Sequence, residues 1–561
     1  MSKRAVPTNS RAIILATFVA FGGFLFGYDI GVISGCLIMD DFVERFGEQA
    51  ADGSFFLSSH RQSIITSLLS AGTFVGALGQ AFTSDRFGRR GTILIWAAIF
   101  TIGTAIQTGT DRSIVQISIG RFIAGLGVGA MSELRTCLQV FVCRSLMDMW
   151  IRENAVALWR SSLFCCLLLD MCGAIVPLYN GETAPKALRG TLLVLYQLQI
   201  IVGIFISYII DLGTHSINNS ASWRIPVGLQ MLWGLILLSG LFFLPESPRH
   251  LLGTGKRDEA RAVIAELNSV PLDDPLVDET VDELQYAINA ENEGGQVGWA
   301  ECFSTRNMLW KRTANGMMLQ FIQQLNGQNF YYYYGDTFFK SAGTELSPYV
   351  IQTILGAVSV AGTVPALYLI ETWGRRRSLL TGSIMEAVCA IIAGLVGHFT
   401  LAPKGTPSDQ LTPSQKSGGD TLIAFAVLHV FSFSVFWGPV PWVYLGESFP
   451  LRVRPKAIAL GSATNWLWNF LLSFFAPRIA DDIGPLILMI FFGMLVFGFV
   501  YVYLAIPETK GLSLEEVDEM YVAGIKPWHS STWKPHRGEE AHEKVARAHE
   551  HKEDHVEKGS V

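Results

Sequence analysis

Charged side chains are scarce in this chain, since Asp, Glu, Lys and Arg make up 16% of its 561 residues while apolar residues make up 50%. A water-soluble protein of this size needs more charge to cover its surface. The composition therefore excludes an ordinary soluble protein. It indicates a protein whose solvent is a lipid bilayer.

Two further absences narrow the function. Five of the eight cysteines lie between Cys137 and Cys172, so neither a disulfide framework nor a metal-ligand spacing follows. The sequence also lacks a phosphate-binding glycine loop and a nucleophile with a plausible base, and its net charge of −6 comes from an acidic loop and a mixed-charge tail. We therefore expect no enzyme, no cofactor, no metal and no nucleic-acid partner.

The chain does contain a series of apolar runs, each of roughly 20 residues and long enough to cross about 30 Å of hydrocarbon as a helix. The first run is too long for a signal peptide and lacks a small-residue cleavage pattern. The sequence predicts twelve spans, near residues 12–35, 63–83, 92–110, 113–132, 191–211, 223–243, 313–336, 348–370, 378–399, 421–445, 457–476 and 484–506.

Basic residues gather on alternate connections between these spans. Under the positive-inside rule such connections are cytoplasmic, which predicts that both termini lie inside the cell. The clusters contain Arg86, Arg89 and Arg90; Arg249, Lys256 and Arg257; Arg375, Arg376 and Arg377; and Arg452, Arg454 and Lys456.

Three motifs at the span ends occur twice. DRFGRR (85–90) matches ETWGRRR (371–377), ETAPKALRG (182–190) matches ESFPLRVRP (447–455), and PESPR (245–249) matches PETKG (507–511). This predicts two halves of six spans related in parallel, with a substrate site between them near mid-membrane. We expect a cytoplasmic N-terminus at 1–11, one half at 12–249, a helical cytoplasmic domain at 250–312, the second half at 313–521 and a disordered tail at 522–561.

Nine motifs in order resemble those of a known family. They are GGFLFGYDIGVISG, SDRFGRR, GRFIAGLGVGA, PLYNGETAPKALRG, PESPRHLL, QQLNGQNFYYYY, ETWGRRR, GPVPWVYLGESFP and PETKGLSLEE. The chain thus resembles the sugar porters of the major facilitator superfamily, and fungal hexose transporters most closely, over roughly residues 11 to 522. The resemblance implies an all-α membrane protein with the major facilitator fold, twelve transmembrane helices in two six-helix halves, and a cytoplasmic helical linker domain.

Residues 133–173 interrupt the resemblance. In the family, a sequence like GLGVGAMS runs directly into AIVPLYNGETAP, whereas 41 residues intervene here. A single crossing of the membrane by this stretch would invert every later loop, against the positive-inside rule. We favour the hypothesis of a retained intron over that of a real family-specific loop. Two single departures are Ala81, where the family has glycine, and Ser359, where many members have asparagine.

Two charges lie inside the predicted spans, where each costs at least about 2.5–3.5 kcal/mol. Asp29 is in the first span and Arg121 in the fourth, at a similar depth, so we expect them to form a salt bridge that offsets the desolvation of both. The resemblance implies that Asp29 is the proton acceptor of a symporter and that the proton is the coupling ion. The alternative is a static pair that holds the two spans together.

The seventh span, QQLNGQNFYYYY, supplies amides and hydroxyls that suit an uncharged sugar. Gln323, Gln324 and Asn329 would not share a face of a straight helix, but Asn326 and Gly327 are suited to break it between them. By resemblance the sugar contacts are Gln323, Gln324 and Asn329, with Tyr333 and Tyr334 nearer the outer gate, together with Gln197, Trp442 and the weaker candidates Phe26, Asn465 and Trp466. The alternatives are polar packing between helices for the amides and tyrosines, and core or lipid-facing positions for the aromatic residues.

Acids and bases recur at the predicted cytoplasmic ends of the spans. We expect them to form ion pairs between the halves that break when the inner side opens, because topology signals alone would explain the arginines but not the repeated acids. These gating candidates are Asp85, Arg86, Arg89, Arg90, Glu182, Arg189, Glu246, Arg249, Glu371, Arg375, Arg376, Glu447 and Arg452. Glu386 and His429 also lie in spans and are given no role.

The resemblance implies a monomeric plasma-membrane transporter of a monosaccharide, with glucose as the default hexose, that works by alternating access in symport with a proton. Fructose, mannose, galactose and xylose stay open, because single hydroxyl contacts decide among them. The alternatives are a proton-independent facilitator and a sugar sensor that does not transport. The short tail disfavours the sensor.

Overall fold

The computed structural model describes residues 10–51, 53–132, 189–268, 270–293, 298–342, 346–401, 412–450, 453–512 and 514–534. A helix or a broken pair of helices lies at the position of each of the twelve predicted spans. Six helices of the described residues are long and apolar enough to cross a membrane. The first helix, α1 (Ser10–Cys36), passes this test only together with α2 (Asp40–Phe46), to which it is bent by 83°. The predicted insert at 133–173 lies outside the described residues.

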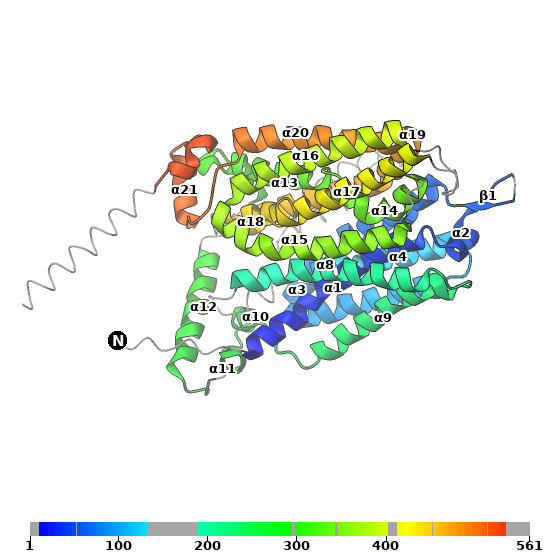
Figure 1. Cartoon of the computed structure of the whole chain (residues 1–561). Coiled ribbons are helices and arrows are strands. Elements are labelled where there is room, and N and C mark those ends of the chain that lie inside the picture. Colours follow the sequence, from blue (N-terminus) through cyan, green and yellow to red (C-terminus); the bar gives the residue numbers. More distant parts are fainter. Residues whose placement is uncertain are drawn as a thin grey trace, which may run out of the picture.

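The described residues of the first half form five long helices and a small substructure at one end. The helix α2 (Asp40–Phe46) and the antiparallel strands β1 (Glu48–Gln49) and β2 (Phe55–Phe56) lie at one end of the bundle, called the hairpin end below (Figure 1). The helix α3 (Ser59–Thr108) contains the second and third predicted spans, and the chain turns between them at Gly88, where φ is 75°. The long helices are α1 (Ser10–Cys36), α3 (Ser59–Thr108), α4 (Ile114–Ser132), α8 (Arg189–Thr214) and α9 (Ala221–Leu241).

The second half repeats this pattern with two interruptions. The seventh predicted span is split into α13 (Leu309–Gln324) and α14 (Gln328–Ala342), and the tenth into α17 (Pro413–Val435) and α18 (Val440–Glu447). The remaining helices are α15 (Pro348–Trp373), α16 (Arg375–Thr400), α19 (Arg454–Ile483) and α20 (Ile487–Ala505). The halves meet where α1 packs on α14, α8 on α15 and α3 on α19.

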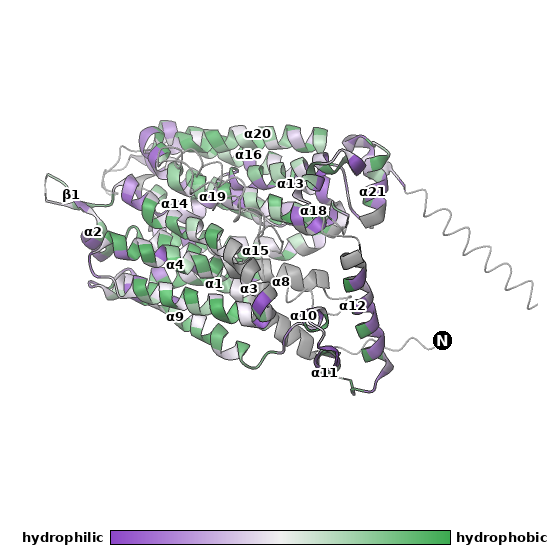
Figure 2. Cartoon of the chain, turned by 180° about the vertical axis from the view of Figure 1, so that it is seen from behind, coloured by the Kyte–Doolittle hydropathy of each residue, from purple (hydrophilic) through white to green (hydrophobic). Residues whose placement is uncertain are grey.

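The segment between the halves forms short helices at the opposite end of the bundle, called the linker end below (Figure 1). They are α10 (Pro248–Gly253), α11 (Arg257–Asn268), α12 (Pro275–Glu293), η1 (Trp299–Phe303) and η2 (Arg306–Met308). The stretches GKRDEARAVIAEL (255–267) and VDETVDELQYAINAENE (277–293) have helical periodicity and correspond to α11 and α12. Leu251, Ile264 and Val277 form part of a small core between α10, α11 and α12. Figure 2 shows the polar outer surface of α12 against the mostly apolar bundle.

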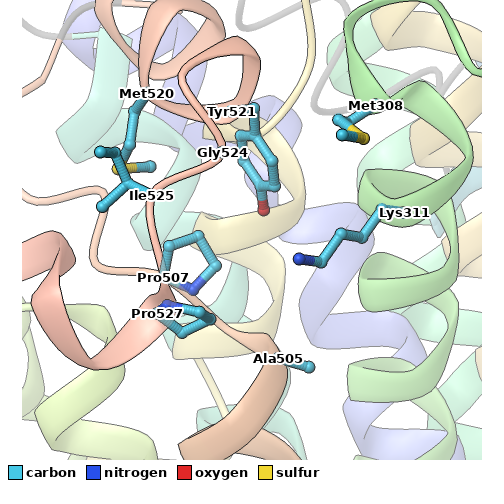
Figure 3. A pocket seen from close by; sticks show the side chains of 9 residues that line it. All are labelled: Met308, Lys311, Ala505, Pro507, Met520, Tyr521, Gly524, Ile525 and Pro527. Atoms are coloured by element: carbon cyan, nitrogen blue, oxygen red, sulfur yellow. The ribbon is translucent and has the colours of Figure 1, made fainter.

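The predicted disorder from residue 522 onward is wrong for residues 522–534. The helix α21 (Leu514–Val522) and the turn η5 (Pro527–Thr532) pack together, with Ile525 and Trp533 against the buried Met520. The polar composition of the tail hides these few apolar anchors. A pocket between this tail, α13 and the end of α20 is lined by residues that include Lys311, Tyr521 and Pro527 (Figure 3).

Candidate functional site

The two charges inside the first half form a buried ion pair. Arg121 Nη1 lies 2.8 Å from Asp29 Oδ1, and both side chains are at most 1% exposed. Arg121 Nε also donates to the carbonyl of Ile65, at 3.2 Å. Asp29 Oδ2 and Arg121 Nη2 have no partner among the described residues. The predicted contact is therefore present, and each partner keeps one polar atom that is not satisfied.

The break in the seventh span lies at the two residues that the sequence singles out. Gly327 has a φ of 104°, in the left-handed region that favours glycine. The Asn326 side chain accepts a hydrogen bond from the backbone N–H of Gln328, at 3.0 Å, and donates to Glu386 Oε2, at 3.0 Å. Asn326 thus satisfies the start of α14, and Glu386 fixes Asn326 in turn.

This break brings side-chain amides from α13, α14 and α19 together. Asn465 Nδ2 donates to Gln320 Oε1 and to Gln323 Oε1, both at 2.8 Å. The oxygen Gln324 Oε1 accepts from Asn329 Nδ2 and, at 3.0 Å, from Asn469 Nδ2. All these residues except Asn329 are buried. We call Gln320, Gln323, Gln324, Asn329, Asn465 and Asn469 the amide cluster.

The amide cluster extends to the other half through hydroxyl groups. Tyr333 donates to Asn469 Oδ1 at 3.1 Å, and Ser70 of α3 donates to the same oxygen at 2.9 Å. Tyr334 instead donates to the carbonyl of Ser473. The structure therefore brings Tyr333 into the cluster and places Tyr334 beside it on α19.

Sequence reasoning missed three members of this arrangement, Gln320, Asn469 and Ser70. Gln320 precedes Gln324 by four residues and Asn469 follows Asn465 by four, so each lies one turn from a predicted residue on the same helix face. That spacing was the available signal. Nothing in the sequence around Ser70 indicates its contact with a residue 399 positions away.

The aromatic candidates separate into two groups. Phe26 of α1 and Trp466 of α19 pack edge to face across the two halves, with ring centroids 5.3 Å apart. Trp442 packs against an apolar cluster that contains Leu445 and Phe449. The structure thus shows Trp442 in an apolar environment rather than in a hydrogen-bonded contact with the amides. The side chain of Gln197 lies outside the described residues.

The gating candidates show the internal repeat in atomic detail. Glu246 Oε1 accepts from the backbone N–H of Arg89, at 2.8 Å, just after Gly88. In the second half, Glu508 Oε1 accepts from the backbone N–H of Arg375, at 2.8 Å, just after Gly374. A Cβ on either glycine would lie 2.4 Å from the carboxylate, so each Glu fills the space that glycine leaves. A negative charge at the start of a helix is stabilising. The predictions include Glu246 and miss its counterpart Glu508.

The ion pairs expected between the halves stay a prediction, and the partners that the structure describes for these residues lie within one half. Arg375 Nη2 pairs with Glu447 Oε1 at 2.6 Å within the second half. Arg90 donates to the carbonyl of Leu241 in the first half, and Arg376 to that of Val502 in the second. These side chains bind carboxylates and free carbonyls at the helix ends of their own half, which are the nearest acceptors.

The other gating candidates are less informative. Arg86 is exposed and lies over the Phe87 ring, and Arg249 is in the first turn of α10. The side chains of Asp85, Arg189 and Glu371, and the whole of Glu182 and Arg452, lie outside the described residues.

Comparison with known proteins decides the family. The "Sugar (and other) transporter" family matches residues 15–139 and 136–521. A low-affinity glucose transporter of Kluyveromyces lactis is 39% identical over 522 residues, which cover 93% of this chain and 84% of that protein. A high-affinity hexose transporter of Saccharomyces cerevisiae is 38% identical over 533 residues, which cover 95% and 85%. The chain belongs to the sugar transporter family.

Solved structures show the fold of this sugar transporter. A proton:xylose symporter of the major facilitator superfamily, bound to 6-bromo-6-deoxy-D-glucose, has a TM-score of 0.65 at 24% identity and covers 91% of this chain and 100% of its own. An inward-open xylose transporter from E. coli has a TM-score of 0.66 at 23% identity and covers 91% and 99%. The transporter therefore has the major facilitator fold. The family match and the fungal relatives show that it is a transporter and not an enzyme.

The family match also bears on the interruption in the sequence. The two matched ranges overlap at residues 136–139, within the stretch 133–173 that departs from the family pattern. This sugar transporter therefore aligns with its family on both sides of the departure.

Proposed function

We propose that this transporter carries a hexose, with glucose as the default, across the plasma membrane by alternating access and in symport with a proton. The observation that carries the proposal is the amide cluster, because it joins the broken seventh span to α19 where the halves meet. An uncharged sugar presents hydroxyls that both donate and accept, and amides offer both functions in one side chain. The names of the two fungal relatives support a hexose as the substrate.

In this structure the amides of the cluster form hydrogen bonds to one another and to backbone carbonyls. Gln323 Nε2 donates to the carbonyls of Trp437 and Gly438, at 2.9 and 2.7 Å, in the break between α17 and α18. A bound sugar would replace some of these bonds, so selectivity depends on how well its hydroxyls match them. Gln197 and Trp442 stay predicted sugar contacts.

Alternating access is supported by where the halves are joined. Gln352 donates to Ser34 and Lys340 donates to the carbonyl of Ile38, each at 3.2 Å and each between helices of opposite halves. Both contacts lie at the hairpin end, which we assign to the outside of the cell, with both termini inside. The arginine and glutamate contacts that the structure describes at the linker end lie within one half, which supports a conformation closed to the outside.

Proton coupling is assigned to the Asp29–Arg121 pair. Protonation of Asp29 would remove the charge that holds Arg121, and the unpaired Arg121 would then favour a different packing of α1 on α4. The alternative is a facilitator in which the same pair only joins the two helices.

The test is sugar uptake in a yeast strain that lacks its own hexose carriers, with residues 133–173 both present and deleted. We expect uphill glucose accumulation that a proton uncoupler abolishes. Asp29→Asn should keep sugar exchange and lose accumulation. Uptake that ignores the uncoupler would identify a facilitator, and the absence of any monosaccharide uptake by either form would refute the proposal.

A further inference from the structure

Two acidic side chains that the proposed proton coupling does not use are buried at the hairpin end. Asp211 is on α8 of the first half and Asp336 on α14 of the second, and each is 1% exposed. Both carboxylate oxygens of Asp211 and Oδ1 of Asp336 lack a hydrogen-bond partner among the described residues. A buried carboxylate without a partner is costly, so the pair needs an explanation.

The two carboxyl groups lie against adjacent residues of α1, Asp211 at Gly35 and Asp336 at Ser34. A Cβ on Gly35 would be 2.5 Å from Asp211 Oδ2, so the carboxyl group packs directly on that glycine. The Ser34 hydroxyl interacts with Asp336. Asp211 and Asp336 are therefore near enough to interact electrostatically, although they come from opposite halves.

Acceptor oxygens around the two carboxyl groups lack hydrogen-bond donors among the described residues. Gln352 uses its amide nitrogen to donate to Ser34 and, at 2.8 Å, to the carbonyl of Tyr331. Its oxygen is buried without a partner among the described residues. Asp211 Oδ1 and Oδ2, Asp336 Oδ1 and Gln352 Oε1 are therefore four acceptors without a donor among the described residues. A protonated carboxyl group would supply a missing donor and would also remove a buried charge.

The described cations nearby are engaged elsewhere. Arg121 pairs with Asp29, and Lys340 Nζ donates to the carbonyl of Ile38. His215 contacts the carbonyl of Leu212 and stacks on Tyr349, with ring centroids 4.3 Å apart. The other titratable groups around the pair are Tyr28 and Cys36 on α1, Tyr208 on α8, Tyr332 and Tyr333 on α14, and Tyr349 on α15. These groups carry no positive charge that would neutralise two carboxylates.

We infer that Asp211 and Asp336 form a proton-binding site whose occupation holds the hairpin end closed. Because the two side chains belong to opposite halves, separation of the halves would expose both to water, where each ionises and loses its proton. Closure then takes up one or two protons and opening releases them. The inference rests on the proposed alternating access for the opening step, and it adds a site distinct from Asp29.

Cys36 provides a reporter for the test, since it is fully buried in α1 beside the pair. The full-length transporter in intact cells is treated with a membrane-impermeant methanethiosulfonate between pH 4.5 and 8, and Cys36→Ser measures labelling at other cysteines. Because thiolate formation itself depends on pH, the reference is Asp211→Asn/Asp336→Asn, which keeps the thiol. The matched control is Asp40→Asn, which removes an exposed acid at the same end.

The labelling rate of the wild type should rise with pH more steeply than that of the double variant, by about one decade per pH unit for each proton released. Asp40→Asn should follow the wild type. Equal slopes in the wild type and the double variant would overturn the inference. If the double variant does not reach the membrane, the single variants decide, since each should reduce the slope and an unchanged slope in both would overturn it.

Sugar uptake separates this inference from the proposed function. Cys36 labelling needs no sugar. If the labelling rate rises steeply with pH in a protein that takes up no sugar, only the proposed function is refuted. If sugar is taken up but the pH slope of labelling is equal in the wild type and the double variant, only the proton site is refuted.

Discussion

Asn469 is the residue at which the amide cluster, the second half and the first half meet, so its removal is the most informative perturbation. Its amide nitrogen donates to Gln324, and its oxygen accepts from Tyr333 and Ser70. Asn469→Ala leaves the two hydroxyls without an acceptor, and an unsatisfied buried donor costs about 1–3 kcal/mol. Water that enters the space left by the asparagine side chain would recover part of this free energy.

We expect Asn469→Ala to raise the KM for glucose by about ten- to a hundredfold, which corresponds to about 1.4–2.8 kcal/mol. The physical reason is that Gln324 loses one of the two bonds that hold its oxygen, so the site is less preorganised for sugar. The measurement is initial-rate uptake at varied glucose, normalised to transporter at the membrane. Gln285→Ala, which alters an exposed amide on α12, is the matched control and should not change KM.

The bond between the halves is tested by a double-mutant cycle on the melting temperature in detergent. Ser70→Ala removes one hydrogen bond, worth about 0.5–1.5 kcal/mol, and should be almost neutral once Asn469 is already alanine. Fully additive effects would show that Ser70 and Asn469 do not interact in the working protein. An unchanged KM in Asn469→Ala would refute the amide cluster as the sugar site.

Three further predictions concern stability. Gly327→Ala should destabilise the transporter by about 1–2 kcal/mol, because alanine resists the positive φ and its Cβ would lie 2.9 Å from the Phe491 ring, whereas Gly493→Ala meets nothing and should not lower the melting temperature. Glu508→Gln should lower the melting temperature by removing the charge at the start of α16, and the exposed Glu279→Gln is the control; equal melting curves would contradict the helix-end argument. Outside the spans, burial alone would raise the pKa of Asp41, but hydrogen bonds from Arg45 and Trp223 outweigh it and lower the pKa. The stability from Asp41 is then present above the unfolded pKa of about 3.9 and is lost as the pH falls through the folded value, so the melting-temperature gap between wild type and Asp41→Asn should shrink below about pH 4. A constant gap would argue against that charge effect.

Local features of the sequence determined much of this protein. Apolar length gave the positions of the spans, and the Asn-Gly pair at 326–327 gave the break in the seventh span, because helix formation and its interruption depend on neighbouring residues. The salt bridge between Asp29 and Arg121 was also predictable, since a charge in a span needs a partner at its own depth. The repeated motifs alone indicate two halves.

Only the tertiary structure decided which polar groups meet. Glu246 and Glu508 contact the helix start that follows a glycine in their own half, whereas charge patterning alone suggests for Glu246 a partner in the other half. Ser70 reaches Asn469, and Asp211 and Asp336 converge on Ser34 and Gly35, through the packing of helices that are distant in sequence. Such contacts depend on how helices are rotated and crossed, which residue periodicity does not specify.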